Sequence, residues 1–301
     1  TYVLLGDSEM SEGSQWEAAL LASYYNLDNL IAIVDVNRLG QRGPTIFGHD
    51  LTEYSNKFEA FGWNTVIIED GHDINQIIDA YHAALSNKES PSVLIALTKK
   101  GRGISFIEDK DGWHGKAIPK DKFGEALSEI GDINKNIKAN ISKPEKKNIS
   151  IAKEDKKLLK IDSDKISTRK AYGLGLVNAF KEFKDIVVLD AEVSNSTFSM
   201  IFKEHYPNRF FEMFVAEQNM VSMALGLSLR GKIPFVSSFA AFLTRAFDQI
   251  RMSQYSNSNI KFCGSHAGVS IGEDWLSQMG LEVIAMFRTL NDCIVLYPSV
   301  G

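Results

Sequence analysis

Two polar side chains that could bind a metal ion follow the first two apolar runs of the chain. Asp7 comes after the run 2–5, and Asn37 follows the run 30–36 about thirty residues later. That spacing is one strand–helix–strand repeat, so both side chains should lie at the same edge of a parallel sheet. Carboxylate, amide and backbone carbonyl oxygens suit Mg²⁺ or Ca²⁺ and not zinc, and such an ion would neutralise a diphosphate. The alternative is that both residues only cap turns.

The elements that must position these residues alternate between short apolar runs and stretches with helical periodicity. In the first half, we predict strands at 2–5, 30–36, 63–68 and 92–97, and helices at 14–26, 51–61, 73–87 and 120–131. In the second half, we predict helices at 167–183, 217–229 and 240–256, and strands at 186–190, 210–215, 233–237 and 259–263. Continuous strands rich in Val, Ile and Phe are typical of a parallel sheet buried on both faces. We therefore predict an α/β fold with two doubly wound parallel-sheet domains.

Charge divides the chain into two lobes and a linker. Residues 135–165 hold ten Lys against five acidic residues, whereas the whole chain has a net charge of -5. We predict domains at 1–134 and 166–301 joined by a long, basic, solvated linker at 135–165. The net charge argues against nucleic acid or an anionic membrane as a partner.

The cysteine content and the hydropathy indicate a cytoplasmic protein. Only Cys263 and Cys293 occur, without a pairing framework, which fits a reducing compartment. No apolar run approaches the roughly 20 residues that a membrane span needs. Because Thr1 stands where a buried strand already begins, we expect the sequence to be a piece of something longer.

The residues around the proposed metal site resemble a family motif. The run GDSEMSEGSQWEA at 6–18, followed by LDNL at 27–30 and DVNRLGQ at 35–41, is similar to the thiamine diphosphate and metal motif of transketolases. The resemblance implies that Asp7, Asn37 and the Leu39 carbonyl hold Mg²⁺, with Ca²⁺ as another candidate ion. It also implies that Ser8, Glu12 and Asn37 lie at the cofactor. Ser8 stands where the family usually has Gly, and it would be strained if that position requires a positive φ.

Two later segments of the first half also resemble transketolases. They are KKGRG at 99–103 and DGWHGK at 111–116. The resemblance implies that Lys100 lies near the cofactor and that His114 contacts both diphosphate and sugar, where an imidazole can pass protons near pH 7. Taken alone, a His in a Gly-flanked loop is more often simply solvated.

The second half carries residues that could bind a phosphate. Arg169 opens the first helix after the linker, and Ser196 follows the strand that ends at Asp190. A guanidinium fork and a hydroxyl donor both suit phosphate, although a surface Arg and a capping Ser are the plainer interpretation. By resemblance, Arg169, Ser196 and His266 bind the sugar phosphate, and Asp274 binds a sugar hydroxyl.

An acidic residue in the second half could take part in proton transfer. Glu217 begins a helix directly after the aromatic strand 210–214, where apolar surroundings should make its carboxyl resist ionisation. In transketolases the matching Glu bonds to the aminopyrimidine ring and promotes formation of the ylide, so Glu217 and His114 are the predicted catalytic residues.

The remaining cofactor contacts are also assigned by resemblance. Phe239 and Phe242 would line the aminopyrimidine pocket, sharing one helix face because they are three residues apart, and Gln278 would lie near the cofactor. Without the family, that Phe pair would be assigned to core packing. Glu192 stands where the family carries a shorter Asp close to the cofactor, and Trp275 replaces a Gly and could narrow the substrate channel.

The resemblance implies a homodimeric transketolase with active sites at the subunit interface. The enzyme would transfer a two-carbon ketol unit from a ketose phosphate to an aldose phosphate in the pentose phosphate pathway, using thiamine diphosphate. It also implies that part of the phosphate-binding domain and a whole third domain are absent, so that this chain alone need not be active. Alternatives are an inactive or regulatory paralogue that acts through dimerisation, and another thiamine diphosphate enzyme such as deoxyxylulose phosphate synthase or phosphoketolase.

Overall fold

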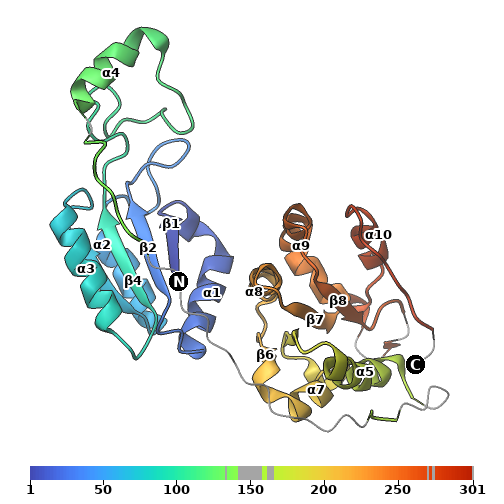
Figure 1. Cartoon of the computed structure of the whole chain (residues 1–301). Helices are drawn as coiled ribbons and strands as arrows, with labels where there is room; N and C mark the ends of the chain where they lie inside the picture. The colour runs from blue at the N-terminus through green and yellow to red at the C-terminus, as the bar shows by residue number, and fades with distance from the viewer. Residues whose placement is uncertain (133, 142–157, 161–165, 270, 273–274, 300–301) are drawn as a thin grey trace. The chain divides into compact units, whose positions relative to one another are not determined.

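The computed structural model describes residues 1–301 except 133, 142–157, 161–165, 270, 273–274 and 300–301. Contacts between residues divide the chain into unit 1, Thr1–Asn148, and unit 2, Ile149–Gly301. Each unit contains a four-stranded sheet in which every strand pair is parallel (Figure 1). The predicted α/β class with two parallel sheets is confirmed.

Unit 1 has the strand order β1-β2-β4-β3. Its strands are β1 (Tyr2–Gly6), β2 (Ile31–Val36), β3 (Asn64–Ile68) and β4 (Ser92–Leu97), and its helices are α1 (Gly13–Tyr24), α2 (Leu51–Ala60), α3 (Ile74–Ser86) and α4 (Phe123–Ile130). One core cluster joins residues of α1 and α2 to β2 and β4, and a second joins α3 to the same strands. The helices therefore cover both faces of the sheet at β2 and β4. The expectation that the first strand is buried is wrong, because β1 lies at the edge of the sheet and Leu4 is 73% exposed.

Unit 2 has the strand order β6-β5-β7-β8. Its strands are β5 (Ile186–Asp190), β6 (Phe210–Glu212), β7 (Ile233–Phe239) and β8 (Lys261–Ser265), and its helices are α5 (Thr168–Glu182), α6 (Ser194–Thr197), α7 (Met200–His205), α8 (Glu217–Leu229), α9 (Phe247–Ser253) and α10 (Val283–Arg288). The chain runs from β5 to β6 on one side and then to β7 on the other. The ends of β5 and β7 thus flank the point where strand order reverses, which is where open α/β sheets bind ligands.

Short polar side chains fix where several helices begin. Asp50 accepts hydrogen bonds from the backbone N–H groups of Thr52 and Glu53 at the start of α2. Ser167 accepts one from Lys170 N at the start of α5. These caps satisfy donors that have no partner within the helix, and they explain why the predicted and observed starts agree closely.

The predicted helix at 240–256 is wrong in its first part. Residues Ala241–Ala246 form a 3-10 helix, η4, and the α-helix α9 begins only at Phe247. Strand β7 also runs on to Phe239, which pairs in register with Ser265 of β8. Phe239 and Phe242 therefore do not share a helix face, because the first belongs to the strand and the second to η4.

The expectation that residues 135–165 are solvated throughout is wrong at Leu159. Its N–H donates to Asn178 Oδ1 at 2.7 Å, and its carbonyl accepts from Asn178 Nδ2 at 3.0 Å. Its side chain packs against the core cluster under α5. A single Asn on α5 thus binds this part of the segment to unit 2. Much of the predicted linker lies outside the described residues.

Within the described part of the chain, no helix is both long enough and apolar enough to cross a membrane.

Candidate functional site

The Asp7 carboxylate lies buried just beyond the end of β1 and is held by backbone donors. Oδ2 accepts from Arg38 N at 2.6 Å and from Thr45 Oγ1 at 3.3 Å, and Oδ1 accepts from Ser8 N at 2.9 Å. Burial raises the pKa of this carboxyl, and these hydrogen bonds oppose the rise. Because Arg38 follows β2, the contact joins the two strand ends that the sequence predicts to be neighbours.

Asn37 is oriented by a neighbouring carboxylate. Its Nδ2 donates to Asp35 Oδ2 at 3.2 Å, and its Oδ1 accepts from Leu39 N at 3.1 Å. Asp35 is also the acceptor of a hydrogen bond from the Thr98 hydroxyl. The amide oxygen of Asn37 is therefore turned toward Leu39, which is the side where the sequence places the other metal ligand.

Lys100, in the segment between β4 and α4, contacts two other predicted site residues, Leu39 and His114. Lys100 Nζ donates to Leu39 O at 2.9 Å and lies 3.3 Å from His114 Nδ1. Lys100 follows β4, and His114 belongs to the loop before α4. The Leu39 carbonyl oxygen thus accepts a hydrogen bond from an ammonium group.

A cavity of about 730 Å³ opens beside these residues in unit 1. Its lining includes Asp35 and Asn37 from the end of β2, and Thr98 and Lys100 from the segment that follows β4. These are carboxyl ends of parallel strands, the edge at which a sheet of this kind binds ligands. Of the predicted metal and cofactor residues, Asn37 and Lys100 border this space, which is large enough for a small molecule.

Ser8 is not strained, because its position does not require the positive φ on which that expectation depended. Its φ is -64° and its ψ is -37°, an ordinary right-handed conformation at the start of the 3-10 helix η1 (Glu9–Ser11). A side chain is therefore accommodated here without the positive φ that would favour Gly. Glu12 is exposed and directly precedes α1, so it lies near the same edge of the sheet.

Positive φ angles recur just beyond strand ends, at residues other than Gly. Arg38, Glu192 and Phe214 each stand two residues after the last residue of β2, β5 and β6, with φ of 61°, 63° and 52°. Sequence reasoning did not single out Arg38, which also forms an ion pair with Asp109 at 2.8 Å. Hydrogen bonding to the Arg38 guanidinium lowers the pKa of Asp109. This pair ties the end of β2 to the loop that follows β4.

In unit 2, two of the three predicted phosphate ligands contact each other. Arg169 Nη1 donates to the Ser196 carbonyl at 2.6 Å, and the Arg169 guanidinium lies 5.5 Å from the centroid of the Phe198 ring. Arg169 is the second residue of α5, and Ser196 lies in the short helix α6 after β5. The structure therefore brings these two residues to one place in unit 2.

Glu217 is buried, with 3% of its surface exposed, at the first position of α8. Its Oε2 lies 3.1 Å from Nε of Arg245, which belongs to η4 and has an exposed side chain. The expectation of apolar surroundings alone is therefore incomplete, because a guanidinium pairs with the carboxylate. No local pattern in the sequence relates two residues 28 positions apart, which is why Arg245 was missed.

The aromatic residues predicted to line the ring pocket do gather together. The rings of Phe239 and Phe242 stack with centroids 4.9 Å apart and an interplanar angle of 1°. The His266 ring lies 4.1 Å from Phe239, and its Nδ1 is 3.0 Å from Ser265 Oγ. Two residues predicted for different roles, one for the cofactor and one for phosphate, are thus in contact.

The other predicted residues of unit 2 are more scattered. Glu192 is exposed, and its backbone N–H donates to Glu212 Oε1 at 3.0 Å. Gln278 ends the 3-10 helix η7 (Leu276–Gln278), and Trp275 before it is 78% exposed, so its indole does not fill the interior of unit 2. Asp274 lies outside the described residues.

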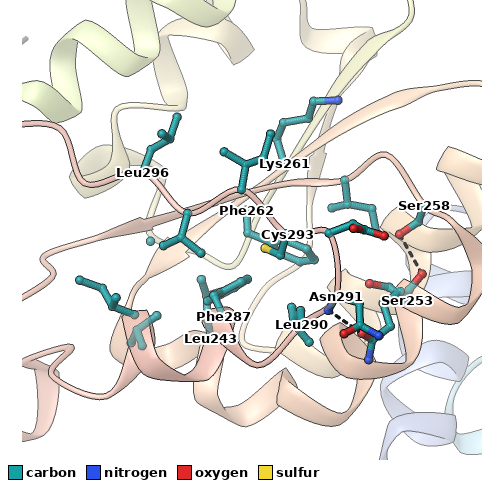
Figure 2. A pocket seen from close by; sticks show the side chains of 18 of the residues that line it. Leu243, Ser253, Ser258, Lys261, Phe262, Phe287, Leu290, Asn291, Cys293 and Leu296 are labelled. Carbon is teal, nitrogen blue, oxygen red and sulfur yellow. Dashed lines mark hydrogen bonds between the residues drawn. The ribbon is translucent and has the colours of Figure 1, made fainter.

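A second cavity, in unit 2, contains none of the predicted site residues. Its volume is about 1020 Å³, and Figure 2 shows apolar side chains around it, among them Phe262 of β8, Phe287 of α10 and Leu296. The predicted residues of unit 2 lie elsewhere, mainly at the ends of β5 and β7. Cavity size alone therefore does not identify the candidate site.

Comparison with known proteins matches both halves of the chain to known domains. A family model described as the thiamine diphosphate binding domain of transketolase matches residues 1–169, and one for the transketolase pyrimidine binding domain matches residues 164–301. Human transketolase is 48% identical over 306 residues, which cover 100% of this chain and 48% of the relative. Mouse transketolase-like protein 2 is 49% identical over 304 residues, with 99% and 48% covered.

Solved structures show the same fold. Transketolase from Leishmania mexicana has a TM-score of 0.74 at 20% identity, and the match covers 96% of this chain and 50% of that structure. A transketolase mutant from Pichia stipitis gives a TM-score of 0.73 with similar coverage. The chain thus spans about half the length of the relatives it matches. The two matched domains, which together cover all 301 residues, place this chain in the transketolase family.

Proposed function

We propose that this chain supplies the cofactor-binding parts of a transketolase, which transfers a two-carbon ketol unit from a ketose phosphate to an aldose phosphate. The observation that carries the proposal is the meeting of Asp7, Leu39, Lys100 and His114 at one sheet edge, through contacts made by three separate loops. Because the chain spans about half of its relatives, the complete reaction is assigned to the full enzyme and not to this chain alone.

The residues of unit 1 fit a divalent ion bound to a diphosphate. Asp7, Asn37 and the Leu39 carbonyl offer three hard oxygen donors, which suit Mg²⁺ and also Ca²⁺. Among the described residues there is no group of three His, Cys, Asp or Glu side chains that could hold a metal ion, so the proposed site depends on the Asn37 amide and the Leu39 carbonyl as well as on Asp7. Ser8, Glu12, Lys100 and His114 would then contact the cofactor.

In unit 2, the residues fit an aromatic ring with a nitrogen that exchanges a proton. Thiamine diphosphate supplies a carbon nucleophile when it is bound. Glu217 would bond to the ring nitrogen through its carboxyl group, and the stacked rings of Phe239 and Phe242 would exclude water. Glu192 and Gln278 would lie at the edge of the same ring.

The substrate end of the proposal rests on cationic and hydroxyl groups. Arg169, Ser196 and His266 would bind the sugar phosphate, Asp274 would bind a sugar hydroxyl, and His114 would also bind the sugar. Arg169 supports this role because its guanidinium is held beside Ser196 and keeps further N–H donors for a ligand.

We also propose the assembly, location, pathway and domain division of the protein. It would form a homodimer in the cytoplasm and act in the pentose phosphate pathway. Its domains would lie at 1–134 and 166–301, with a linker at 135–165. The free thiols of Cys263 and Cys293 support a reducing compartment.

Calorimetric titration of the 301-residue chain with thiamine diphosphate and Mg²⁺ tests the cofactor site. We expect binding that Asp7→Asn weakens by at least about tenfold, because the variant removes the one charged group among the three proposed ligands of the ion. Asp79→Asn changes an exposed acid of α3 and serves as the control. Equal affinity for both variants would refute the assignment of Asp7.

A second candidate is an inactive or regulatory relative that acts by dimerising. Relatives named transketolase-like protein 2 are 47–49% identical to the chain, as similar as those named transketolase. The normal φ of Ser8 removes one argument for inactivity, whereas Glu192 and Trp275 remain departures. A ketol-transfer assay on the full enzyme separates the two: turnover dependent on thiamine diphosphate supports the first candidate, and absence of turnover with intact cofactor binding supports the second.

A further inference from the structure

Asp190, the last residue of β5, is a fully buried acid to which the sequence assigned no role. It is 0% exposed. Its Oδ1 accepts from Val193 N at 2.8 Å, and its Oδ2 accepts from Thr197 Oγ1 at 2.7 Å and Ser199 Oγ at 2.8 Å. All three donors belong to the loop at 193–199. One carboxylate therefore fixes the backbone and two hydroxyls of a single loop.

The same loop meets the start of α5. The carbonyl of Ser196 accepts from Arg169, and Phe198 has a φ of 62°. At Gly173 an added Cβ would lie 2.2 Å from the Phe198 carbonyl oxygen. Only Gly therefore allows α5 to approach the loop this closely. The loop is thus held by Asp190 from within and placed against the helix that carries Arg169.

A carboxylate is a costly way to hold this loop. Burial raises the pKa of Asp190 to about 6, although three hydrogen bonds oppose the rise. The negative charge of Glu212 on β6 also raises the pKa of Asp190. The charge of Asp190 in turn raises the pKa values of Tyr172 on α5 and Cys263 on β8. None of these groups of the described chain is a cation. An Asn would avoid the charge but has one acceptor oxygen for three donors.

We propose that Asp190 is a positioning residue for a phosphate monoester: it fixes the loop 193–199 so that Ser196 and Arg169 face the same ligand phosphate. The inference rests on the proposed function, which assigns these two residues to the sugar phosphate. It adds the carboxylate and hydroxyls that hold them in place, none of which needs to touch the ligand.

The test is a comparison of binding by NMR titration of the 301-residue chain, with fructose 6-phosphate and fructose as probes. The variant Thr197→Val/Ser199→Ala removes both hydroxyl donors while keeping the loop's length. We expect it to weaken fructose 6-phosphate binding about tenfold and to leave fructose binding unchanged. The single variant Thr197→Ser keeps the hydroxyl at this position, and its affinity for fructose 6-phosphate should lie within about twofold of that of the original chain. Ser222→Ala removes an exposed hydroxyl on α8 and is the control.

Arg169→Ala separates failure of this inference from failure of the proposed function. If Arg169→Ala binds fructose 6-phosphate as tightly as the original chain, the assignment of the phosphate to Arg169 is wrong, and the inference fails with it. If Arg169→Ala weakens binding but the double variant does not, only the role of Asp190 and its loop is overturned. Circular dichroism checks each fold, and the single variants Thr197→Val and Ser199→Ala carry the test should the double variant not fold.

Discussion

Replacing Asp190 by Asn should change how the stability of unit 2 depends on pH. The pKa of Asp190 rises from 3.8 to about 6 on folding, mainly through burial. Each pH unit of that interval corresponds to about 1.4 kcal/mol, so ionising Asp190 at neutral pH costs about 3 kcal/mol of stability. The folded state holds the proton of Asp190 more tightly than the unfolded state does. Protonated Asp190 therefore stabilises the fold fully below about pH 4, and this contribution is lost as the pH rises through 6. The amide of the variant has no charge to gain over this range.

Denaturation measured at pH 4, 5, 6 and 7 checks this prediction. Hydrogen exchange of the β5 amides in urea reports the unfolding of unit 2 separately from unit 1. Relative to the original chain, Asp190→Asn should gain about 3 kcal/mol between pH 4 and pH 7. Asp185→Asn alters an exposed acid paired with Lys232 just before the same strand and should give a nearly constant difference. A constant difference for Asp190→Asn as well would refute the argument.

Three further changes test the packing and the ion pair. Gly173→Ala should destabilise unit 2 by about 2 kcal/mol, because a carbonyl oxygen would lie 2.2 Å from the new Cβ. The control Gly175→Ala on the same helix places its Cβ where nothing lies within 4 Å, so it should leave the stability unchanged or raise it by up to about 1 kcal/mol. Urea denaturation measures both variants. Arg245→Ala should cost about 1 kcal/mol, since the guanidinium is largely exposed, and the cost should vanish in a Glu217→Gln background in a double-mutant cycle. Ser8→Gly should not stabilise unit 1, because the φ of Ser8 is negative; a rise in its melting temperature would contradict this.

Most of the fold could be predicted because local patterns determine it. Strands such as β2 and β4 are continuous apolar runs bounded by polar residues, and Asp50 and Ser167 mark helix starts by capping. The region after β7 could not be predicted, because nothing local distinguishes the 3-10 turns of η4 from the α-helix that follows. The contact of Leu159 with Asn178 was also hidden, since it depends on a distant Asn.

The candidate site was predictable in composition but not in its supporting contacts. Asp7, Asn37 and Lys100 could be found because strand ends and a family motif mark them. Asp190 and Arg245 could not, because their importance comes from burial and from partners that only folding brings near. An acid at the end of a buried strand, followed by several hydroxyl residues, is the signal that would have indicated Asp190.

The positive φ angles just beyond the strands bear on how a ligand would bind. Arg38, Glu192 and Phe214 adopt the left-handed conformation, which costs side chains other than Gly on the order of 1 kcal/mol each, and folding of the sheets supplies that energy. The loops already have this backbone conformation in a structure that contains no ligand. A ligand that binds there loses less affinity to the ordering of loops, and its association depends more on its own contacts than on folding the protein around it.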